Sequence, residues 1–372
     1  MGKKILAINP GSTSTKIAIF DDETLVNETG LNHPVSEMNK FPTTFSQLDF
    51  RYEVIMDYLK SINFDINSLD ACVGRGGYLH PITAGTYTVN DAIKHDLEIA
   101  LNGDHAANLG GLLARKIGEQ VGCPSYIVDP TAVDELQDVA RLSGMPEIKR
   151  VSKIHALNMR AVAREYAKSI GKKMEDLNLV VAHMGGGCTT GALSHGKMID
   201  MFNGLDGDGA FAPTRSGAVP VGDLIRLCYS GKYATVDDMM KRAVGDAGIA
   251  AYLGTADMRE VNKMIENGDE NAKLVKEAFI YQHAKDIGSL SVVMKGKVDA
   301  IYSPTDNMIA AGINTVSMVA NEAKIPFIVA EEGMCTGGGL ATYGVNYYKL
   351  GQQTAKQAVK ILEGKAEPKD MP

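Results

Sequence analysis

The chain has 372 residues, more than one hydrophobic core usually organises, and an ordinary 45% of them are hydrophobic, so we expect a globular protein with two lobes. A formal net charge of -7 without any block of like charges argues against a nucleic-acid or membrane surface, which would need a basic patch. The five cysteines contain no C-x-x-C pair, which argues against a disulfide framework or a structural zinc site and favours a reducing cytoplasm. The apolar run at the N-terminus is too short for a signal peptide, and no stretch is long enough to span a membrane.

In chain order, the first elements are two β-rich runs at residues 4–8 and 16–20, which flank a turn of glycine, serine and threonine. Residues 179–199 repeat this arrangement. Helical patterns lie at about 52–62, 91–101, 106–120, 153–169, 221–230, 234–244, 257–267 and 271–294, with a β run at 126–129. The tail adds a strand, a helix at about 307–323, a second strand and a helix at about 346–363. Strands that alternate with helices indicate an α/β fold.

The two glycine turns align without a gap. Asn9 then falls on His183, Gly11 on Gly185, Thr15 on Thr189 and Ala18 on Ala192. A glycine turn between β runs in each half of the chain indicates a duplicated architecture. We therefore expect two related lobes, each of which offers one turn to a cleft.

The first turn, NPGSTSTK at residues 9–16, has the composition of a phosphate cradle. Glycine allows close approach of the backbone, hydroxyl groups donate hydrogen bonds, and a lysine follows. It is not a P-loop, in which G-K-[ST] enters a helix, because this turn leads into a strand. Such residues also form ordinary hairpin turns. The recurrence of the turn as MGGGCTT at residues 184–190 favours phosphate binding.

Eight segments occur in the order and context seen in butyrate kinases, so residues 3–301 resemble that family, with acetate kinases as more distant relatives. They are NPGSTSTK, VGRGG, HAANLG, IVDP, IHALN, HMGGGCTTGAL, DGDGAFAPTRSGAVPVGDL and LGTADMREV. The resemblance implies a two-lobed fold of the actin-like and sugar-kinase type, with duplicated βββαβα-like domains of five strands around an ATP cleft. The expected domains are residues 1–150 and 151–301, followed by an atypical α/β tail at 302–372.

The activity implied by the resemblance is transfer of the γ-phosphoryl group of ATP to a short-chain carboxylate such as butanoate, giving an acyl phosphate. A carboxylate is already ionised at neutral pH, so the reaction needs no strong general base. Its difficulty is electrostatic, because an anion must approach a polyanion. Catalysis should therefore depend on cations, oriented hydrogen-bond donors and Mg²⁺.

Two arginines and a histidine at matched positions are the expected catalytic groups. Arg75 and Arg215 would bind the carboxylate and the transferring phosphoryl group, since a planar guanidinium suits both anions. Arginines in loops are otherwise most often solvated. His183 ends an apolar run before the second glycine turn, where a histidine is often a core residue; by resemblance it would donate to the γ-phosphoryl group.

The resemblance also assigns residues to the metal and the nucleotide. Asn9 and Asp129 match positions near Mg²⁺, which usually keeps several waters. Asp129 could hold such a water or orient Arg75 or Arg215, and the sequence leaves these roles open. Asp257 and Arg259 match adenosine-contacting positions, although a helix N-cap and an exposed first-turn charge explain them equally well. The residues expected to bind phosphates are Asn9, Ser12, Ser14, Lys16, Gly185, Gly186 and Gly187. No firm role follows for His105, Asn108 or His155.

The pattern changes at about residue 302. The kinase family continues there with a Gly-Gly-Ile turn that cradles adenosine, whereas this tail resembles the C-terminal part of ABC-transporter solute-binding proteins with a YxPTDN motif. We interpret the chain as a hybrid whose tail replaces the last structural units of the kinase. Glu331 and Glu332 are the nearest substitutes for a late acidic residue of the family. If a Gly-Gly turn near 337–339 filled the adenosine site, the exchange of the tail would have no functional consequence.

Three functions are compatible with these patterns. The first is a butyrate-type kinase, whose family is homo-oligomeric. The second is a nucleotide- or ligand-binding hybrid with little or no turnover, because the tail alters the adenosine pocket. The third is a phosphotransferase with a hydroxyl acceptor, which would need a general base. The two arginines and His183 favour the carboxylate acceptor.

Overall fold

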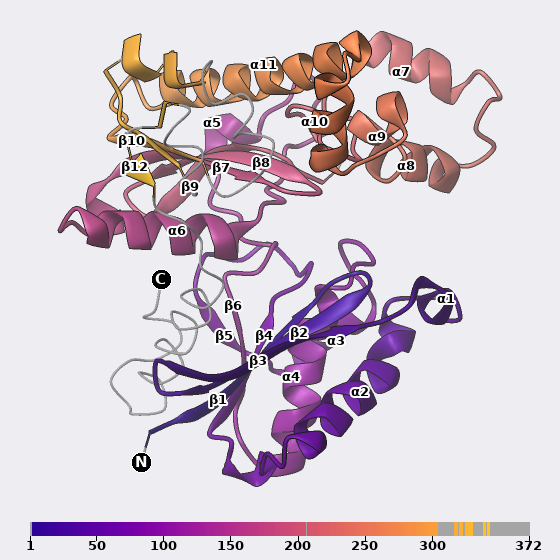
Figure 1. Ribbon diagram of the computed structural model, residues 1–372, viewed down its shortest axis with the longest axis vertical. Coiled ribbons are helices and arrows are strands. Elements are labelled where there is room, and N and C mark those ends of the chain that lie inside the picture. The colour runs from indigo at the N-terminus through magenta and orange to yellow at the C-terminus, as the bar shows by residue number, and fades with distance from the viewer. Residues whose placement is uncertain are drawn as a thin grey trace. The chain divides into compact units, whose positions relative to one another are not determined.

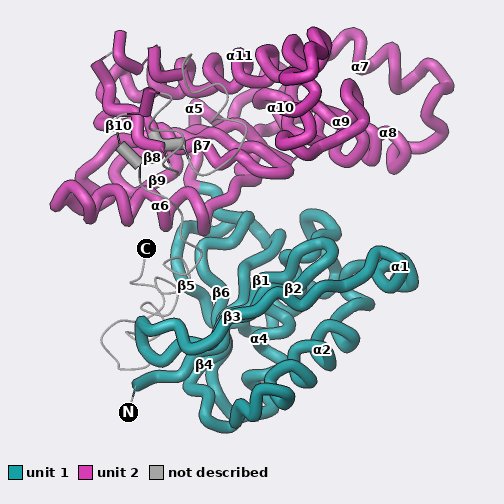
Figure 2. The backbone as a smooth tube through the Cα atoms, viewed as in Figure 1, with its two compact units in different colours: residues 1–134, 346–372 teal, residues 135–345 magenta. Residues whose placement is uncertain are grey.

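The computed structural model describes residues 2–205, 207–303, 316–318, 320–322, 324–329, 338–339 and 341–342. These residues fall into two compact units, which divide between Asp134 and Glu135 (Figure 2). Each unit contains a mixed sheet of six described strands with helices packed on it (Figure 1).

The first unit is built on a sheet with the strand order β3-β2-β1-β4-β6-β5. Its strands are β1 (Lys4–Pro10), β2 (Ser14–Asp21), β3 (Thr24–Asn32), β4 (Ala71–Arg75), β5 (Thr86–Thr88) and β6 (Ser125–Val128). Strands β1, β4 and β6 are parallel, and the outer strands run antiparallel to their neighbours. Its α-helices are α1 (Val35–Met38), α2 (Leu48–Ser61), α3 (Asp91–Glu98) and α4 (Asn108–Val121).

Close packing of α4 on β4 organises this unit, and paired glycines permit it. A Cβ atom on Gly74 would lie 2.0 Å from the carbonyl oxygen of Gly110, and one on Gly110 would lie 2.2 Å from that of Arg75. The core beneath contains Leu6, Ile8 and Leu109. The backbone of β4, which ends at Arg75, is therefore held tightly against the first turn of α4.

The second unit has the strand order β12-β11-β10-β7-β8-β9 in its described residues. The strands are β7 (Asn178–Met184), β8 (Cys188–Ser194), β9 (Lys197–Phe202), β10 (Ala300–Ser303), β11 (Phe327–Val329) and β12 (Ala341–Thr342). The α-helices are α5 (Asp138–Arg141), α6 (Ala156–Ser169), α7 (Val221–Cys228), α8 (Val236–Val244), α9 (Gly248–Leu253), α10 (Met258–Glu266) and α11 (Glu270–Val293). Helices α6 and α11 lie on opposite faces of the sheet (Figure 1).

Five strands of each sheet share one topology, which confirms the duplicated architecture predicted from the turns. The sixth strands differ, because β5 runs antiparallel to β6 whereas β12 runs parallel to β11. Strands β7, β8 and β9 take the places of β1, β2 and β3, and β10 and β11 take those of β4 and β6. The gap-free alignment is wrong beyond the turn, however. Asn9 pairs with Lys16, whereas His183 pairs with Thr189, so the second turn is one residue shorter. By this pairing, Ala18 corresponds to Gly191 instead of Ala192.

The described part of the tail continues the second sheet. Strand β10 contains residue 302, where the sequence pattern changes, and pairs in parallel with β7. Strand β11 pairs in parallel with β10, and β12 with β11. Glu331, Glu332 and Gly337 lie outside the described residues, as do the predicted helix at 346–363 and the first part of the helix predicted at 307–323.

Candidate functional site

The first unit brings three candidate residues to one edge of its sheet. Asn9 lies at the carboxyl end of β1, Arg75 ends β4, and Asp129 directly follows β6. Since β1, β4 and β6 are adjacent and parallel, their carboxyl ends share one sheet edge. This is the edge at which open α/β sheets bind ligands.

The first glycine turn, which is predicted to bind phosphate and is called the phosphate turn below, follows β1 at this edge. Gly11 closes it by donating a hydrogen bond of 2.7 Å to the carbonyl oxygen of Ser14. Asn9 and Lys16 are exposed and face each other across the β1–β2 pair. Ser12 is exposed and Ser14 half-buried. The turn also rests on Arg51, a buried residue of α2 that the sequence analysis did not identify.

Arg75 is half-buried and lies in a segment where glycine is sterically required. A Cβ atom on Gly76 would lie 2.3 Å from that of Pro130, and one on Gly77 would lie 2.3 Å from Oδ1 of Asn108. Asn108 is buried and accepts a hydrogen bond of 2.9 Å from the amide of Tyr78. The segments VGRGG and HAANLG therefore pack against each other, and this packing fixes the backbone that carries Arg75.

Asp129 combines burial with an unusual backbone conformation. It is 2% exposed and has a φ of 38°. Non-glycine residues with positive φ are uncommon and are enriched at functional sites. The amide of Gly85 donates to Oδ1 at 2.9 Å, and the amide of Asp129 donates to the Gly85 carbonyl at 2.9 Å. These paired hydrogen bonds fix the carboxylate at the end of β6.

The donor set at this edge suits Mg²⁺ better than a metal that needs several side-chain ligands. No group of three or more His, Cys, Asp and Glu side chains is placed to hold a metal in the described part of the chain. One carboxylate, one amide oxygen and several waters form a normal Mg²⁺ environment. Asp129 and Asn9 could supply the two protein oxygens.

In the second unit, His183 is the second-last residue of β7 and lies in a cluster that orients its ring. The ring stacks on that of His155, with centroids 3.8 Å apart and 11° between the planes. Asn158 Nδ2 lies 2.7 Å from His183 Nδ1, and an amide nitrogen can only donate. With Asn158 Nδ2 as the donor, Nδ1 of neutral His183 accepts, which leaves the proton of the ring on Nε2. That atom would be 3.2 Å from a Cβ on Gly185, so it faces the glycine turn.

Arg215 lies against the same turn. A Cβ atom on Gly187 would lie 2.1 Å from Nη1 of Arg215, so the absence of a side chain at 187 makes room for the guanidinium. Nη1 also donates to the carbonyl oxygen of Gly204. The structure thus brings together His183, Arg215 and the glycine turn, which the sequence analysis had identified separately. His155 and Asn158 join this cluster from the start of α6, although the sequence had given His155 no firm role.

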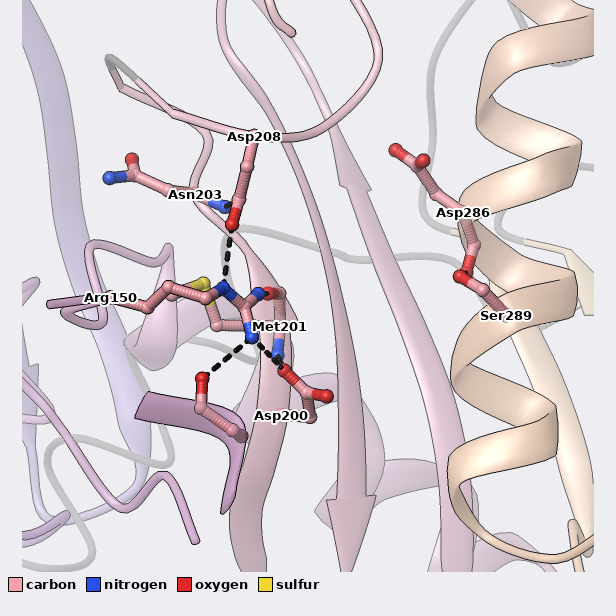
Figure 3. A network of polar contacts seen from close by, with 8 residues as sticks. Arg150, Asp200, Met201, Asn203, Asp208, Asp286 and Ser289 are labelled. Atoms are coloured by element: carbon pink, nitrogen blue, oxygen red, sulfur yellow. Dashed lines mark hydrogen bonds and ion pairs between the residues drawn. The ribbon is translucent and has the colours of Figure 1, made fainter. Parts of the chain in front are cut away.

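The loop that carries Arg215 is anchored from two sides. Arg150 pairs with Asp200 at 2.9 Å and with Asp208 at 2.7 Å (Figure 3). On the other side, Oδ2 of Asp286 on α11 accepts a hydrogen bond of 2.8 Å from the amide of Ala210. Burial, opposed by that hydrogen bond and assisted by the charge of Asp208, raises the pKa of Asp286 to about 6. None of these anchors was evident from the sequence.

Asp257 and Arg259 are engaged with each other at the start of α10. Asp257 is the N-cap and accepts a hydrogen bond of 2.9 Å from the amide of Arg259. The two side chains form an ion pair of 2.6 Å. Hydrogen bonds from Arg259 lower the pKa of Asp257 to about 2. In the described residues, no hydrogen bond or ion pair links either side chain to the His183 cluster, and adenosine contact stays a prediction.

Within the described residues, no helix has the length and apolar character that crossing a membrane requires.

Comparison with solved structures identifies the fold. An acetate kinase from Porphyromonas gingivalis has a TM-score of 0.75 at 18% identity, over 96% of this chain and 99% of that one. A propionate kinase from Francisella tularensis subsp. tularensis has a TM-score of 0.69 at 20% identity, over 95% and 98%. These likenesses confirm the predicted two-lobed α/β fold.

Comparison of sequences gives two results. Residues 249–372 match the family model described as ABC transporter substrate binding protein, as the tail pattern predicted, but the match begins well before residue 302. Butyrate kinase 1 of Clostridium acetobutylicum is 49% identical over 87% of this chain and 90% of its own length. A probable butyrate kinase of Clostridium botulinum is 50% identical over 82% and 88%. Because the match to butyrate kinase 1 covers 87% of the chain, it must overlap the match at residues 249–372. By identity and coverage, the chain belongs to the butyrate kinase family.

Proposed function

We propose that this protein is a carboxylate kinase that transfers the γ-phosphoryl group of ATP to butanoate, giving butanoyl phosphate and ADP. The observation that carries the proposal is about 50% identity to butyrate kinases over most of both chains. The cluster of His183, Arg215 and the glycine turn supports it, because a cation and an oriented N-H donor suit an anionic phosphoryl group. We place the reaction in the cytoplasm, where ATP is present.

In the proposed reaction, a carboxylate oxygen of butanoate attacks the γ-phosphorus while the bond to the β-phosphate oxygen breaks. No proton needs to move, because the nucleophile is already ionised. Arg75 and Arg215 hold the two anions in line and His183 donates from Nε2 to the phosphoryl oxygens. Such electrostatic positioning supplies most of the rate enhancement in phosphoryl transfer.

The remaining residues would bind the nucleotide. The phosphates would be held by Asn9, Ser12, Ser14, Lys16 and the backbone of Gly185, Gly186 and Gly187, and the adenosine by Asp257 and Arg259. Mg²⁺, held by Asn9 and Asp129, would neutralise part of the phosphate charge. Asp129 suits this task because its carboxylate is fixed by Gly85 before any ligand binds.

A direct assay tests the function. The protein is incubated with ATP, Mg²⁺ and butanoate, and acyl phosphate is trapped as the hydroxamate with hydroxylamine. We expect hydroxamate to form only when all three are present. ATP binding without product would instead support the ligand-binding hybrid, which the long match to kinases does not favour. Phosphorylation of hydroxyl compounds alone would indicate a different acceptor.

We also propose that the protein is a homo-oligomer. Helices α7 and α8 bury no side chain completely, and exposed apolar residues lie on both helices and directly after α7. Val221 is 66% exposed, Tyr229 88% and Val236 78%. Exposed apolar groups gathered over neighbouring segments are typical of interfaces. Light scattering after size-exclusion chromatography should give a multiple of the 39.8 kDa chain mass; a monomer at all concentrations would contradict the proposal.

A further inference from the structure

Arg51 is a buried cation that holds the phosphate turn from behind. It lies in the first turn of α2 and is fully inaccessible to solvent. Nη1 donates to the carbonyl oxygens of Gly11 at 2.8 Å and Ser14 at 3.1 Å, and Nη2 donates to that of Ser12 at 3.1 Å. Nη1 also donates to the hydroxyl of Thr15 at 3.1 Å. One guanidinium therefore contacts most of the turn.

The charge of Arg51 has no acidic partner among the described residues. Its remaining contacts are the amide oxygen of Gln47, at 2.9 Å from Nη2 and 3.1 Å from Nε, and the sulfur of Met38 at 3.6 Å. Burial lowers the pKa of Arg51 to about 10, so the group is still protonated at neutral pH. A buried charge without a counter-ion is unfavourable. A polyanion bound on the other side of the turn would relieve this penalty.

The hydrogen bonds of Arg51 also fix the polarity of the turn. In a planar trans peptide, the carbonyl oxygen of one residue and the N-H of the next point in opposite directions. The Gly11 and Ser12 carbonyls point to Arg51, so the N-H groups of Ser12 and Thr13 point away from it. These two amides donate no hydrogen bond to any described residue. Successive amides directed outward form a concavity that binds anions.

A second side chain secures the same turn. The amide of His33 donates to the carbonyl oxygen of Thr13 at 2.8 Å, and its Nε2 lies 2.8 Å from the hydroxyl oxygen of Thr15. His33 is 2% exposed, and burial with the nearby charge of Arg51 lowers its pKa to about 4. It is therefore neutral at pH 7, so of these two buried side chains only Arg51 supplies a charge behind the turn.

Building on the function proposed above, we propose that Arg51 is a positioning residue for the phosphates of ATP. It holds the carbonyl groups of the turn inward, so that the amides of Ser12 and Thr13 face the nucleotide, and it places an unneutralised positive charge behind them. Arg51 does not touch the substrate.

Two substitutions separate these roles. Arg51→Lys keeps the positive charge but lacks the guanidinium that donates to three carbonyl groups at once. Gln47→Glu keeps the shape but places a carboxylate against the guanidinium, which neutralises the charge. For each variant, the affinities for ATP, inorganic tripolyphosphate and adenosine are measured by calorimetry, together with the KM for ATP and for butanoate.

We expect both variants to bind ATP and tripolyphosphate about tenfold more weakly, because Gln47→Glu cancels the positive charge behind the turn and Arg51→Lys no longer holds the carbonyl groups of the turn inward. Adenosine affinity and the KM for butanoate should change by less than about twofold, because neither ligand depends on the turn. Gln47→Glu should unfold at the same temperature as the wild type or higher. This outcome would separate a lost phosphate interaction from general damage to the fold.

Arg160→Lys is the matched control. Arg160 is 1% exposed, donates to the carbonyl oxygen of Gly196 and lies 3.7 Å from Glu135 in the second unit. Its replacement should lower thermal stability without a selective loss of tripolyphosphate binding.

Wild-type ATP affinity in folded Gln47→Glu would overturn the charge role, and an equal loss of adenosine binding in Arg51→Lys would overturn the positioning role. If the wild type makes no butanoyl phosphate but the phosphate-binding differences persist, the proposed function fails and the role of Arg51 stands.

Discussion

Gly187 is needed because a side chain there would collide with a neighbour, and not because the backbone takes a conformation that only glycine favours. A Cβ atom at this position would lie 2.1 Å from Nη1 of Arg215, and the φ of Gly187 is not positive. Gly187→Ala should therefore displace the guanidinium while the β7–β8 pair stays intact. Since a displacement of about 1 Å can lower a rate about a hundredfold, we expect a loss of that order in kcat/KM for butanoate.

Gly186→Ala provides the comparison for this substitution. A Cβ atom there meets no other atom within 4 Å, so only the backbone freedom of glycine is lost. Its effect on kcat/KM should be at least about tenfold smaller than that of Gly187→Ala. Equal losses in the two variants would mean that backbone freedom, and not the position of Arg215, is what matters.

Arg75 is expected to act on the reacting groups directly. Arg75→Ala should lower kcat/KM about a thousandfold, because it removes a charged donor that acts in the transition state. The kcat/KM of Arg75→Lys should lie between those of the wild type and Arg75→Ala, since lysine keeps the positive charge but lacks the planar guanidinium. Steady-state kinetics with butanoate measures both, and circular dichroism checks that the fold is unchanged. Near-normal activity of the alanine variant would remove Arg75 from the mechanism.

The sequence predicts the residues of this site unevenly. His183, Arg215 and the three glycines could be found because they lie in segments with a recognisable pattern. Arg51 could not, since FRYEV in a helix gives no sign that a turn forty residues earlier binds its guanidinium. Asn158 and Arg150 were missed for the same reason, because the side chains that they contact lie at least twenty-five residues away.

At the scale of elements, the longer helices could be predicted because an apolar stripe or a cap marks them. Helix α10, for example, begins at the N-cap Asp257, and α11 begins at the N-cap Asp269. The strand β3 was missed. It lies at the edge of its sheet and buries none of its nine residues, so TLVNETGLN contains no apolar run to reveal it. Its place depends on pairing with β2 along its whole length.

The loop anchored by Asp286 should make stability depend on pH. The folded-state pKa of Asp286 is about 6 and its ordinary value is 3.8, so the folded state favours the neutral carboxyl. The contribution of Asp286 to the free energy of unfolding is fully present below pH 3.8 and is lost as the pH rises to about 6. Asp286→Asn stays neutral and should therefore be more stable than the wild type above pH 6, by about 2 kcal/mol after allowance for partial exposure.

Urea unfolding between pH 4 and 8 measures this difference. The two proteins should converge near pH 4 and separate as the pH rises. Parallel curves over the whole range would show that Asp286 titrates normally.

At the scale of the whole molecule, each unit contains one buried histidine that stays neutral. Burial lowers the pKa of His283 to about 3, and burial with Arg51 lowers that of His33 to about 4. The unfolded chain binds protons at these residues below about pH 6.5, but the folded chain does not. Stability should therefore fall as the pH drops from 6.5, by about 2 kcal/mol for each histidine at pH 5.

His283→Leu tests this prediction in the second unit, because His283 lies beside Phe279 in an apolar core. The variant should lose less stability than the wild type between pH 7 and pH 5 in denaturant unfolding. His95→Leu, on the exposed side of α3, serves as the control and should keep the wild-type dependence. An unchanged pH dependence in His283→Leu would contradict the prediction.

The duplication of the fold could be inferred from two glycine turns, but its register could not. Because the second turn is one residue shorter, every residue of β8 corresponds to a residue of β2 one position later than the gap-free alignment gives. The identities of Thr15 with Thr189 and of Ala18 with Ala192 favour the gap-free register, so the sequence does not reveal this shift. Pairing between strands, which decides the register, depends on backbone geometry that the sequence does not state.

The parallel pairing of β10 with β7 has a consequence for how proteins of this kind diversify. The hydrogen bonds of a ladder join backbone groups, which are common to all sequences. A segment acquired by recombination can therefore join the sheet if it brings a strand, a helix and a second strand of suitable length. This chain, whose residues 249–372 match a transport-protein family and whose larger part matches kinases, has such a strand in β10, which joins its sheet beside β7.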